Sequence, residues 1–519
     1  MVHREGDVEC DLRVVGCQPV REGEEVGLVT VGRGSAGTDS TRHDRVVGPI
    51  VFPDGPRLPF GLPPRPTRGQ GGPMQLSSRF TTRNADRFRF VKAPGLDTPP
   101  AQRDPAVIET VSRMLSEIER GGMDAIARYA RELDRQDAPL ELSAAEIAAS
   151  GDRLAPDLRE AIELGSARTK QFAAMQREHL TDFEAELADG LVVGQRYVPV
   201  GSVGAYLPAG RFPLTASAFM TVGVAKVAGV PSVVACTPPQ PDGGANDAVT
   251  YAAHLSGVDR LFVLGGVQAL AAMAFGLLDT DLDPVDMLVG AGNAYVAEAK
   301  RQLFGTVAID LLAGPSEVAV IADDSADAEI VAADLLGQAE HGPNSPAALV
   351  TTSERLAHEV MAAVERQLPA LSTNAICGPA WRDHGSVVLV PTREDAVLVM
   401  DELAPEHLEV QTTDDEWYHD HLTNYGSLFL GHWSTVAYSD KGMAGTNHTL
   451  PTAGGAKHSA GLSVSRYLKP LTYQRIAREA TPSVAHAVDV ISASEGMSAH
   501  RATATMRLDT YAPVAASND

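Results

Sequence analysis

The sequence has few cysteines and no long apolar run, and both absences exclude classes of protein. Four of its 519 residues are cysteine, and no two of them form a Cys-x-x-Cys pair. This excludes a secreted disulfide scaffold and a thiolate zinc site, and it favours a reducing, cytoplasmic location. No apolar run reaches the roughly 18 to 20 residues that a membrane helix needs, and the N-terminus lacks the apolar core of a signal peptide. The four cysteines are Cys10, Cys17, Cys236 and Cys377.

Basic residues are also scarce relative to acidic ones. The chain has 43 Lys and Arg against 67 Asp and Glu, for a net charge of −24. A phosphate backbone or an anionic membrane would be repelled by this charge, so we expect neither a nucleic acid nor a membrane partner. With 44% hydrophobic residues over 519 positions, the chain exceeds the usual size of one core, which predicts two or more domains.

The first 73 residues differ in composition from the rest. They are rich in Gly, Pro and Arg and lack sustained helical periodicity, so they are predicted to be a disordered extension. Met74 stands where the globular pattern begins. The alternative is therefore that the true start codon is at Met74 and that the preceding stretch is not translated.

The remaining chain alternates helical and β-branched segments. Amphipathic periodicity predicts helices near 105–120, 123–133 and 156–179. From about residue 191, short apolar runs alternate with helices, which is typical of βαβ units. We therefore expect an α/β fold with two Rossmann-like parallel-sheet domains, and small helical segments at the N- and C-terminal ends.

Glycine-rich turns after predicted strands are candidate dinucleotide sites, because glycine lets phosphates approach the backbone at a helix N-terminus. Such turns occur at 208–210, 265–266 and 290–293, but none has the Gly-x-Gly-x-x-Gly pattern. Polar side chains flank them at Tyr206, Gln268 and Asn293. From spacing alone, a buried tyrosine and two turn-capping amides explain these residues at least as well as cofactor binding.

Three further patterns contain candidate catalytic or metal-binding residues. Gln338 and His341 lie three residues apart on one predicted helix face, a spacing that suits metal ligands, or a histidine that caps the helix end. Glu406 and His407 follow a proline, and adjacent carboxylate and imidazole groups suit proton transfer, although the pair is also common on surfaces. Turn formers and potential ligands are dense over 438–452, as in a functional loop.

Taken together and in order, these motifs resemble those of the histidinol dehydrogenase family. The resemblance covers the chain from Met74 to the C-terminus and rests on four separated elements. It implies a zinc-dependent enzyme that oxidises a primary alcohol through the aldehyde to the carboxylate in two hydride transfers to NAD. The four elements are Gln338-Ala-Glu-His341 before Gly-Pro, Pro405-Glu-His407, Gly445-Thr-Asn-His-Thr-Leu-Pro-Thr452 and Glu495-Gly-Met-Ser-Ala-His500.

The resemblance also assigns roles to individual residues. His407 would remove the alcohol proton, and Glu406 would polarise the water that adds to the aldehyde. One zinc ion per subunit would be held by Gln338, His341, Asp440 and His500. Substrate contacts would come from Ser316, His407, Asp440 and Glu495, and NAD contacts from Tyr206, Gln268 and Asn293. The resemblance further implies a homodimer with shared active sites.

The expected division of the chain follows from the same resemblance. Residues 74–205 form an N-terminal helical segment that joins the zinc domain, 206–316 a Rossmann-like NAD domain, and 317–460 the catalytic zinc domain. Residues 461–519 form a dimerisation segment that contributes to the partner's site.

Several positions depart from the usual histidinol pattern. The chain reads Ser439-Asp-Lys441 where that pattern has Gly-Asp-Tyr, Arg211-Phe212 where it has small residues, and Ala209 and Ala291 for a glycine and a proline. These features look more like the branch of the family that includes sulfopropanediol 3-dehydrogenase. Because Arg211 and Lys441 would suit an anionic group, we expect a sulfonated or other anionic diol as substrate. L-histidinol in histidine biosynthesis and a non-catalytic binding role are the alternatives.

Overall fold

The structure is a computed structural model that describes residues 87–95, 104–137, 140–210, 212–278 and 281–511. The predicted extension over residues 1–73 and the predicted substrate contact of Arg211 lie outside these ranges.

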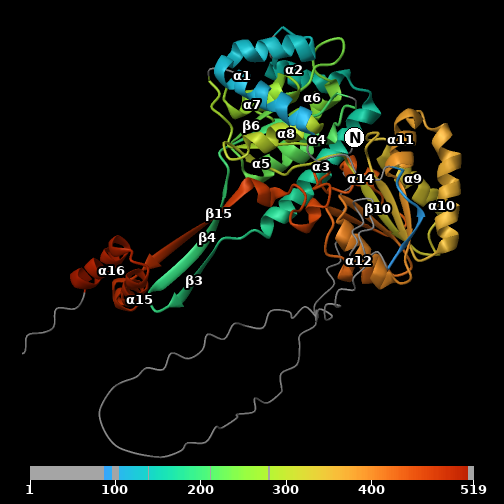
Figure 1. Ribbon diagram of the computed structural model, residues 1–519. Helices are drawn as coiled ribbons and strands as arrows, with labels where there is room; N and C mark the ends of the chain where they lie inside the picture. Colours follow the sequence, from blue (N-terminus) through green and yellow to red (C-terminus); the bar gives the residue numbers. More distant parts are fainter. Residues whose placement is uncertain (1–86, 96–103, 138–139, 211, 279–280, 512–519) are drawn as a thin grey trace, which may run out of the picture. The chain divides into compact units, whose positions relative to one another are not determined.

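The first half of the described chain contains a six-stranded sheet (Figure 1). Its strand order is β2-β7-β6-β5-β8-β9. Strands β5 to β9 are parallel, and β2 pairs with β7 in the antiparallel direction. The strands are β2 (Leu140–Leu142), β5 (Ser202–Tyr206), β6 (Ser232–Thr237), β7 (Arg260–Val263), β8 (Met287–Val289) and β9 (Ala308–Ile309).

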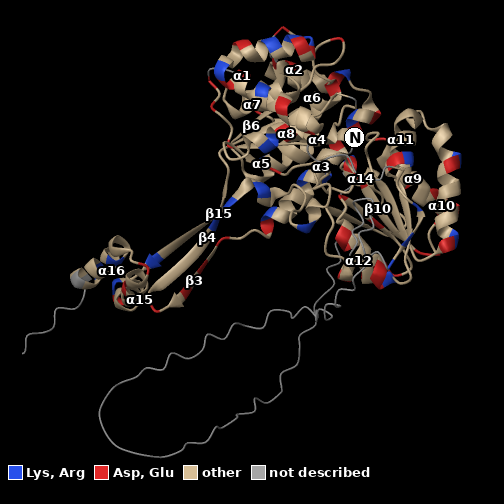
Figure 2. Ribbon diagram, in the orientation of Figure 1, with Lys and Arg blue, Asp and Glu red and all other residues tan. Residues whose placement is uncertain are grey.

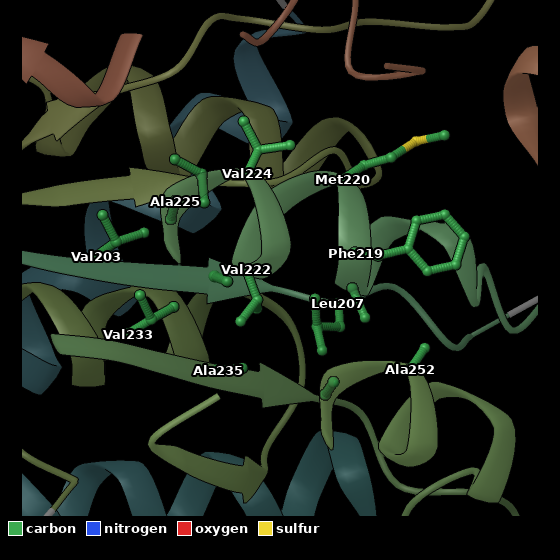
Figure 3. Packing of buried hydrophobic residues seen from close by; sticks show 14 of the residues in the cluster. Val203, Leu207, Phe219, Met220, Val222, Val224, Ala225, Val233, Ala235 and Ala252 are labelled. Atoms are coloured by element: carbon green, nitrogen blue, oxygen red, sulfur yellow. The ribbon is translucent and has the colours of Figure 1, made fainter. Parts of the chain in front are cut away.

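Helices cover both faces of this sheet. One face packs against α3, α6 and the run α4–η4–α5, and the other against α1, α7 and α8. Figure 3 shows the first of these cores, to which Val203 and Val233 of the sheet and Phe219 and Val222 of η4 belong. The helices are α1 (Pro105–Tyr129), α2 (Ala144–Ala149), α3 (Pro156–Glu178), α4 (Ala216–Ala218), η4 (Phe219–Gly223), α5 (Val224–Ala228), α6 (Asp247–Ser256), α7 (Gly266–Ala274) and α8 (Ala294–Leu303).

A second six-stranded sheet has the order β1-β12-β11-β10-β13-β14. All its strands are parallel except β1, which pairs with β12 in the antiparallel direction. The strands are β1 (Arg89–Lys92), β10 (Val318–Ala322), β11 (Ala347–Thr351), β12 (Ser386–Leu389), β13 (His407–Gln411) and β14 (Ser427–Leu430). Together the two sheets confirm the predicted α/β class.

The second sheet is also covered on both faces. Helices α9, α10 and α11 share one core with it, and α12 and α13 share the other (Figure 1). Acidic and basic side chains are interspersed along outer helices such as α1 and α12 (Figure 2). The helices are α9 (Ala328–Ala339), α10 (Glu354–Gln367), α11 (Asn374–His384), α12 (Arg393–Leu403), α13 (Asp415–His421) and α14 (Val436–Asp440).

The third sheet is small, antiparallel and largely exposed. Its order is β15-β4-β3, and every residue of β3 is exposed. Helices α15 and α16 pack against each other. The elements are β3 (Phe183–Ala188), β4 (Leu191–Pro199), β15 (Leu468–Ile476), α15 (Thr481–Ser494) and α16 (Ser498–Tyr511).

Local sequence explains how the long N-terminal helix begins and bends. Asp104 caps α1 by accepting a hydrogen bond from the amide of Ala106, and Pro105 occupies the first helical position. Gly122, with φ +55°, kinks the helix, so two helical stretches meet there as the periodicity predicts. Two elements of the predicted N-terminal segment, residues 74–205, contact different sheets. Strand β1 pairs with the second sheet, whereas α1 packs on α7 and α8, which cover the first. Within the described ranges, no helix has the length and apolarity to cross a membrane.

Candidate active site

Two neighbouring strands place the predicted catalytic residues together. Strands β10 and β13 are parallel and in contact, with Val318 paired to His407. The residues just before β10, Ser316 and Glu317, therefore lie beside Glu406, which precedes β13. The site is at the amino ends of these strands, where the chain enters the sheet.

Glu406 is fixed by a chain of hydrogen bonds. Its Oε2 accepts from the Ser316 hydroxyl at 2.6 Å and from the Glu317 backbone amide at 2.8 Å. The amide of Gln338 donates in turn to the Ser316 hydroxyl at 2.5 Å. Because the amide nitrogen of Gln338 is engaged, its oxygen is turned away from Ser316. Three predicted residues, Ser316, Gln338 and Glu406, thus form one connected group.

His407 is held as a neutral base. Its Nδ1 lies 2.9 Å from the carbonyl oxygen of Glu317, which only accepts hydrogen bonds, so Nδ1 carries the proton. Burial lowers the pKa of His407 to about 4, and the charge of Asp440 opposes this shift. The ring is therefore uncharged near neutral pH. Its Nε2 lone pair lies 3.8 Å from Asp440 Oδ1 and has no hydrogen-bond partner among the described residues.

Three potential metal donors meet beside this base. His341 Nε2 lies 3.6 Å from Asp440 Oδ2, and burial lowers the pKa of His341, which keeps its ring nitrogen available as a ligand. Gln338 Oε1 and Asp440 Oδ1 are buried without a hydrogen-bond partner in the described part of the chain. Unpaired buried acceptors are costly, and a cation would satisfy both. An imidazole, a carboxylate and an amide oxygen together fit zinc.

The described structure brings together fewer potential donors than the sequence analysis predicts. Among the described residues, no three His, Cys, Asp or Glu side chains form a metal-binding group, so the Gln338 amide is needed to reach three donors. The other two predicted residues do not join the cluster. Glu495 follows α15 and His500 lies in α16; both are exposed, and their described hydrogen bonds stay within the C-terminal helices.

The predicted cofactor residues surround turns of the first sheet. The Tyr206 hydroxyl accepts from the Gly266 amide at 3.2 Å, and burial raises the pKa of this tyrosine to about 12. Asn293 caps α8 by accepting from the amides of Tyr295 and Val296. These observations agree with the alternative of a buried tyrosine at 206 and a turn-capping amide at 293, and they leave cofactor binding untested.

Gln268 differs from these two because part of its side chain is unsatisfied. Its amide donates to Asp134 Oδ2 at 2.9 Å, while its buried Oε1 has no hydrogen-bond partner in the described structure. Asp134 also accepts from the Gly265 amide at 2.8 Å, beside the N-terminus of α7. A carboxylate there competes with a phosphate for the positive helix end, so α7 does not offer the usual pyrophosphate site.

Comparison with known proteins identifies the family. The histidinol dehydrogenase family model matches residues 98–508. A histidinol dehydrogenase homolog of Shouchella clausii is 46% identical over 406 residues, which cover 78% of this chain and 95% of the relative. The chain belongs to the histidinol dehydrogenase family. This confirms the resemblance found in the sequence.

Other family members differ in substrate. Sulfopropanediol 3-dehydrogenase of Ruegeria pomeroyi is 45% identical, over 78% of this chain and 93% of the relative. A histidinol dehydrogenase of Gluconobacter oxydans is 39% identical over the same shares of the two chains. The crystal structure of histidinol dehydrogenase from Elizabethkingia anophelis matches with a TM-score of 0.75 and 32% identity, covering 79% of this chain and 94% of that one.

The structure also brings together two residues, Ser217 and His448, to which the sequence analysis gave no role. His448 Nε2 lies 2.9 Å from the Ser217 hydroxyl, and burial lowers the pKa of His448 to about 4. Ser217 belongs to α4, directly before the π-helical turn η4, whose Met220 carbonyl accepts from the Asn447 amide at 2.7 Å. The dense run over 438–452 signalled a functional loop, but only the tertiary contact shows what His448 faces.

Proposed function

We propose that this protein is a zinc- and NAD-dependent dehydrogenase that oxidises a small anionic primary alcohol through the aldehyde to the carboxylate. The observation that carries the proposal is a set of three buried polar atoms without hydrogen-bond partners among the described residues, all at one end of β13. They are Gln338 Oε1, His407 Nε2 and Asp440 Oδ1.

The residues that would hold zinc are Gln338, His341 and Asp440, with His500 supplied by a second copy of the chain in a homodimer. Bound zinc polarises an alcohol or carbonyl oxygen, and bound NAD accepts the hydride. The exposed positions of Glu495 and His500 on the C-terminal helices leave both available to such a partner. We place the cofactor beside Tyr206, Gln268 and Asn293.

The proton chemistry falls to adjacent residues. His407 Nε2, neutral and unpartnered, accepts the hydroxyl proton of the alcohol in the first oxidation. Glu406 polarises the water that adds to the aldehyde, which gives the hydrate that is oxidised in the second step. Its Oε2 lies 3.4 Å from His407 Nδ1, so the two groups act within one small site.

A cation beside the two imidazoles supports an anionic substrate. The charge of Lys441 is one of the influences that lower the pKa values of His341 and His448, so the ammonium group lies within electrostatic reach of both rings. Lys441 is exposed at the end of α14, where it can meet a solvent-borne ligand. The relation to sulfopropanediol 3-dehydrogenase points to the same class. Arg211 remains a predicted second contact.

The test uses the purified full chain with NAD and two alcohols, the sulfonated diol 2,3-dihydroxypropane-1-sulfonate and L-histidinol. We expect one zinc per subunit by elemental analysis, two NADH formed per diol consumed, and a kcat/KM for the diol at least tenfold above that for L-histidinol. Preference for L-histidinol would replace the substrate assignment but keep the chemistry. A zinc-free protein that reduces NAD with neither alcohol would refute the proposed function.

A further inference from the structure

A pair of carboxyl groups, one buried and one half-buried, lies beside the candidate site but takes no part in the chemistry proposed above. Glu409 is fully buried in β13, two residues beyond His407 and on the same face of the strand. Asp334 is in α9, one helical turn before Gln338 and on the same helix face. Gln411 Nε2 donates to Asp334 Oδ2 at 2.8 Å and to Glu409 Oε2 at 3.3 Å, which brings the two carboxyl groups together around one amide. Two carboxyl groups this close can bond to each other only if one of them carries a proton.

The surroundings of Glu409 show which group holds the proton. Its strand neighbours are Val320 on β10 and Phe429 on β14, both part of an apolar core. Of the elements packed around Glu409 in the described structure, α9 presents the charged group, Asp334. Burial and then this charge raise the pKa of Glu409 well above its ordinary value. Burial raises the pKa of Asp334 as well, so the pair holds one proton, and the more deeply buried Glu409 binds it more tightly.

The same pair also holds the start of α14. The Val436 backbone amide donates to Glu409 Oε1 at 3.1 Å, and the Thr435 hydroxyl donates to Asp334 Oδ1 at 2.9 Å. Gln411 donates to Asp334 Oδ2 at 2.8 Å from the same strand as Glu409. Helix α14 has five residues and ends at Asp440. Whatever moves its first turn therefore moves Asp440.

Three elements of the candidate site thus meet at this pair: α9 with Gln338, β13 with His407, and α14 with Asp440. We propose that Asp334 and Glu409 are positioning residues that share one proton, and that this shared hydrogen bond sets the spacing of Gln338, His407 and Asp440. The proposal rests on the proposed function where it concerns zinc. Its proton-sharing part does not depend on the metal or on the alcohol.

Two substitutions of Glu409 distinguish the effect of its hydrogen bonds from the effect of its packing. Glu409→Gln keeps an acceptor for the Val436 amide and gives Asp334 a neutral donor without a titrating proton. Glu409→Leu keeps a similar volume and suits the apolar neighbours, but it removes the acceptors for the Val436 and Gln411 amides and the partner of Asp334. Ser386→Ala, at a buried position of β12 in the same sheet, is the matched control.

The first measurement is the zinc affinity of each variant, by competition with a chromogenic chelator. We expect Glu409→Leu to bind zinc at least tenfold more weakly than the parent, with Glu409→Gln and Ser386→Ala within about threefold of it. Parent-like zinc affinity in a folded Glu409→Leu variant would overturn the positioning role. If the parent binds no zinc, the proposed function fails, and the second measurement still tests the shared proton.

The second measurement is the Tm of the metal-free parent and of metal-free Glu409→Gln as a function of pH. Because the folded state binds the Glu409 proton more tightly than the unfolded chain, the stability that this group contributes falls as pH rises from the ordinary pKa of 4.5 toward the raised folded value. We therefore expect the Tm of the parent to fall relative to that of Glu409→Gln as pH rises through this window. A Tm difference that does not change with pH would exclude the shared proton, even if Glu409→Leu fails to fold.

Discussion

The two large sheets offer their candidate ligand groups at opposite ends of their strands. In the first sheet, Tyr206 ends β5, and the glycine turns at 265–266 and 290–293 follow β7 and β8. In the second, Ser316 precedes β10 and Glu406 precedes β13. Parallel sheets usually bind ligands beyond the carboxyl ends of their strands. The candidate groups of the first sheet lie where this rule expects them, whereas those of the second sheet lie at the amino ends.

The two regions also differ in how their polar groups are satisfied. Near the first sheet, Tyr206 and Asn293 accept hydrogen bonds from backbone amides, which fix the turns without a ligand. Near the second, Gln338 Oε1, His407 Nε2 and Asp440 Oδ1 are buried and have no hydrogen-bond partner in the described part of the chain. We infer that the first region is preformed at Tyr206 and Asn293 but not at Gln268, whose buried Oε1 has no hydrogen-bond partner in the described structure, and that the second is completed by what binds there. Substitutions should therefore affect ligand binding and catalysis in the second region and local stability in the first.

The largest expected effect comes from His341→Ala. Loss of an imidazole ligand leaves too few donors to hold the ion, so activity should be abolished and zinc lost during purification. Elemental analysis gives the zinc content, and Tm with and without a chelator shows whether metal stabilises the fold. The parent should lose stability on chelation, whereas the variant should not change. Full zinc occupancy in the variant would remove His341 from the ligand set.

The next largest effects are expected at His407 and Glu406, and they distinguish proton transfer from metal binding. His407→Asn should lower kcat for alcohol oxidation by about a hundredfold or more, the usual scale for a missing general base, with zinc content unchanged. Glu406→Gln should slow mainly the oxidation of the aldehyde, where water must be activated. Stopped-flow measurement of NADH from alcohol and from aldehyde distinguishes the two steps. If Glu406→Gln loses alcohol oxidation and keeps aldehyde oxidation, the roles are reversed.

A smaller effect concerns the substrate charge. Lys441→Ala should raise KM for the sulfonated diol roughly tenfold, since about 1.4 kcal/mol of binding corresponds to a factor of ten, and it should change kcat less. Lys441→Arg keeps the charge and is the control. Steady-state kinetics with the diol and NAD varied independently gives both constants. An increase in KM for NAD alone would assign Lys441 to the cofactor.

Much of the second site was predictable from sequence because its motifs are local. Glu406 and His407 are adjacent, and Gln338 and His341 share one helix face, so periodicity and spacing group each pair without a fold. The pairing of β10 with β13 brings Ser316 beside Glu406, and Gln338 reaches this group by its hydrogen bond to Ser316. The sequence analysis did not predict this strand pairing and grouped these residues only through the family resemblance. Contacts such as Ser217 with His448, or Asp334 with Glu409, join residues 231 and 75 positions apart, and nothing in the local pattern of either residue indicates them.

The smallest expected effect is at Asn293, and it tests whether the first region is preformed. The side-chain oxygen of Asn293 accepts from the amides of Tyr295 at 3.0 Å and Val296 at 3.1 Å, which leaves the amide nitrogen to donate to a ligand. Asn293→Ala removes both functions and should cost about 1 kcal/mol of folding stability, as for other N-caps. Asn293→Asp keeps an oxygen that accepts both hydrogen bonds and adds a charge that a helix N-terminus favours, so its stability should be at least that of the parent.

Measurements of Tm and of KM for NAD on the two variants distinguish helix capping from cofactor binding. If Asn293 donates to NAD, Asn293→Asp should raise KM for NAD severalfold at unchanged Tm, because a carboxylate cannot donate and would repel the phosphates. If Asn293 only caps α8, Asn293→Asp should bind NAD like the parent, and Asn293→Ala should show the stability loss alone. The second outcome would remove Asn293 from the cofactor site and shift the search for a contact with a hydrogen-bond donor of the cofactor to Gln268, whose buried Oε1 is an acceptor without a partner among the described residues.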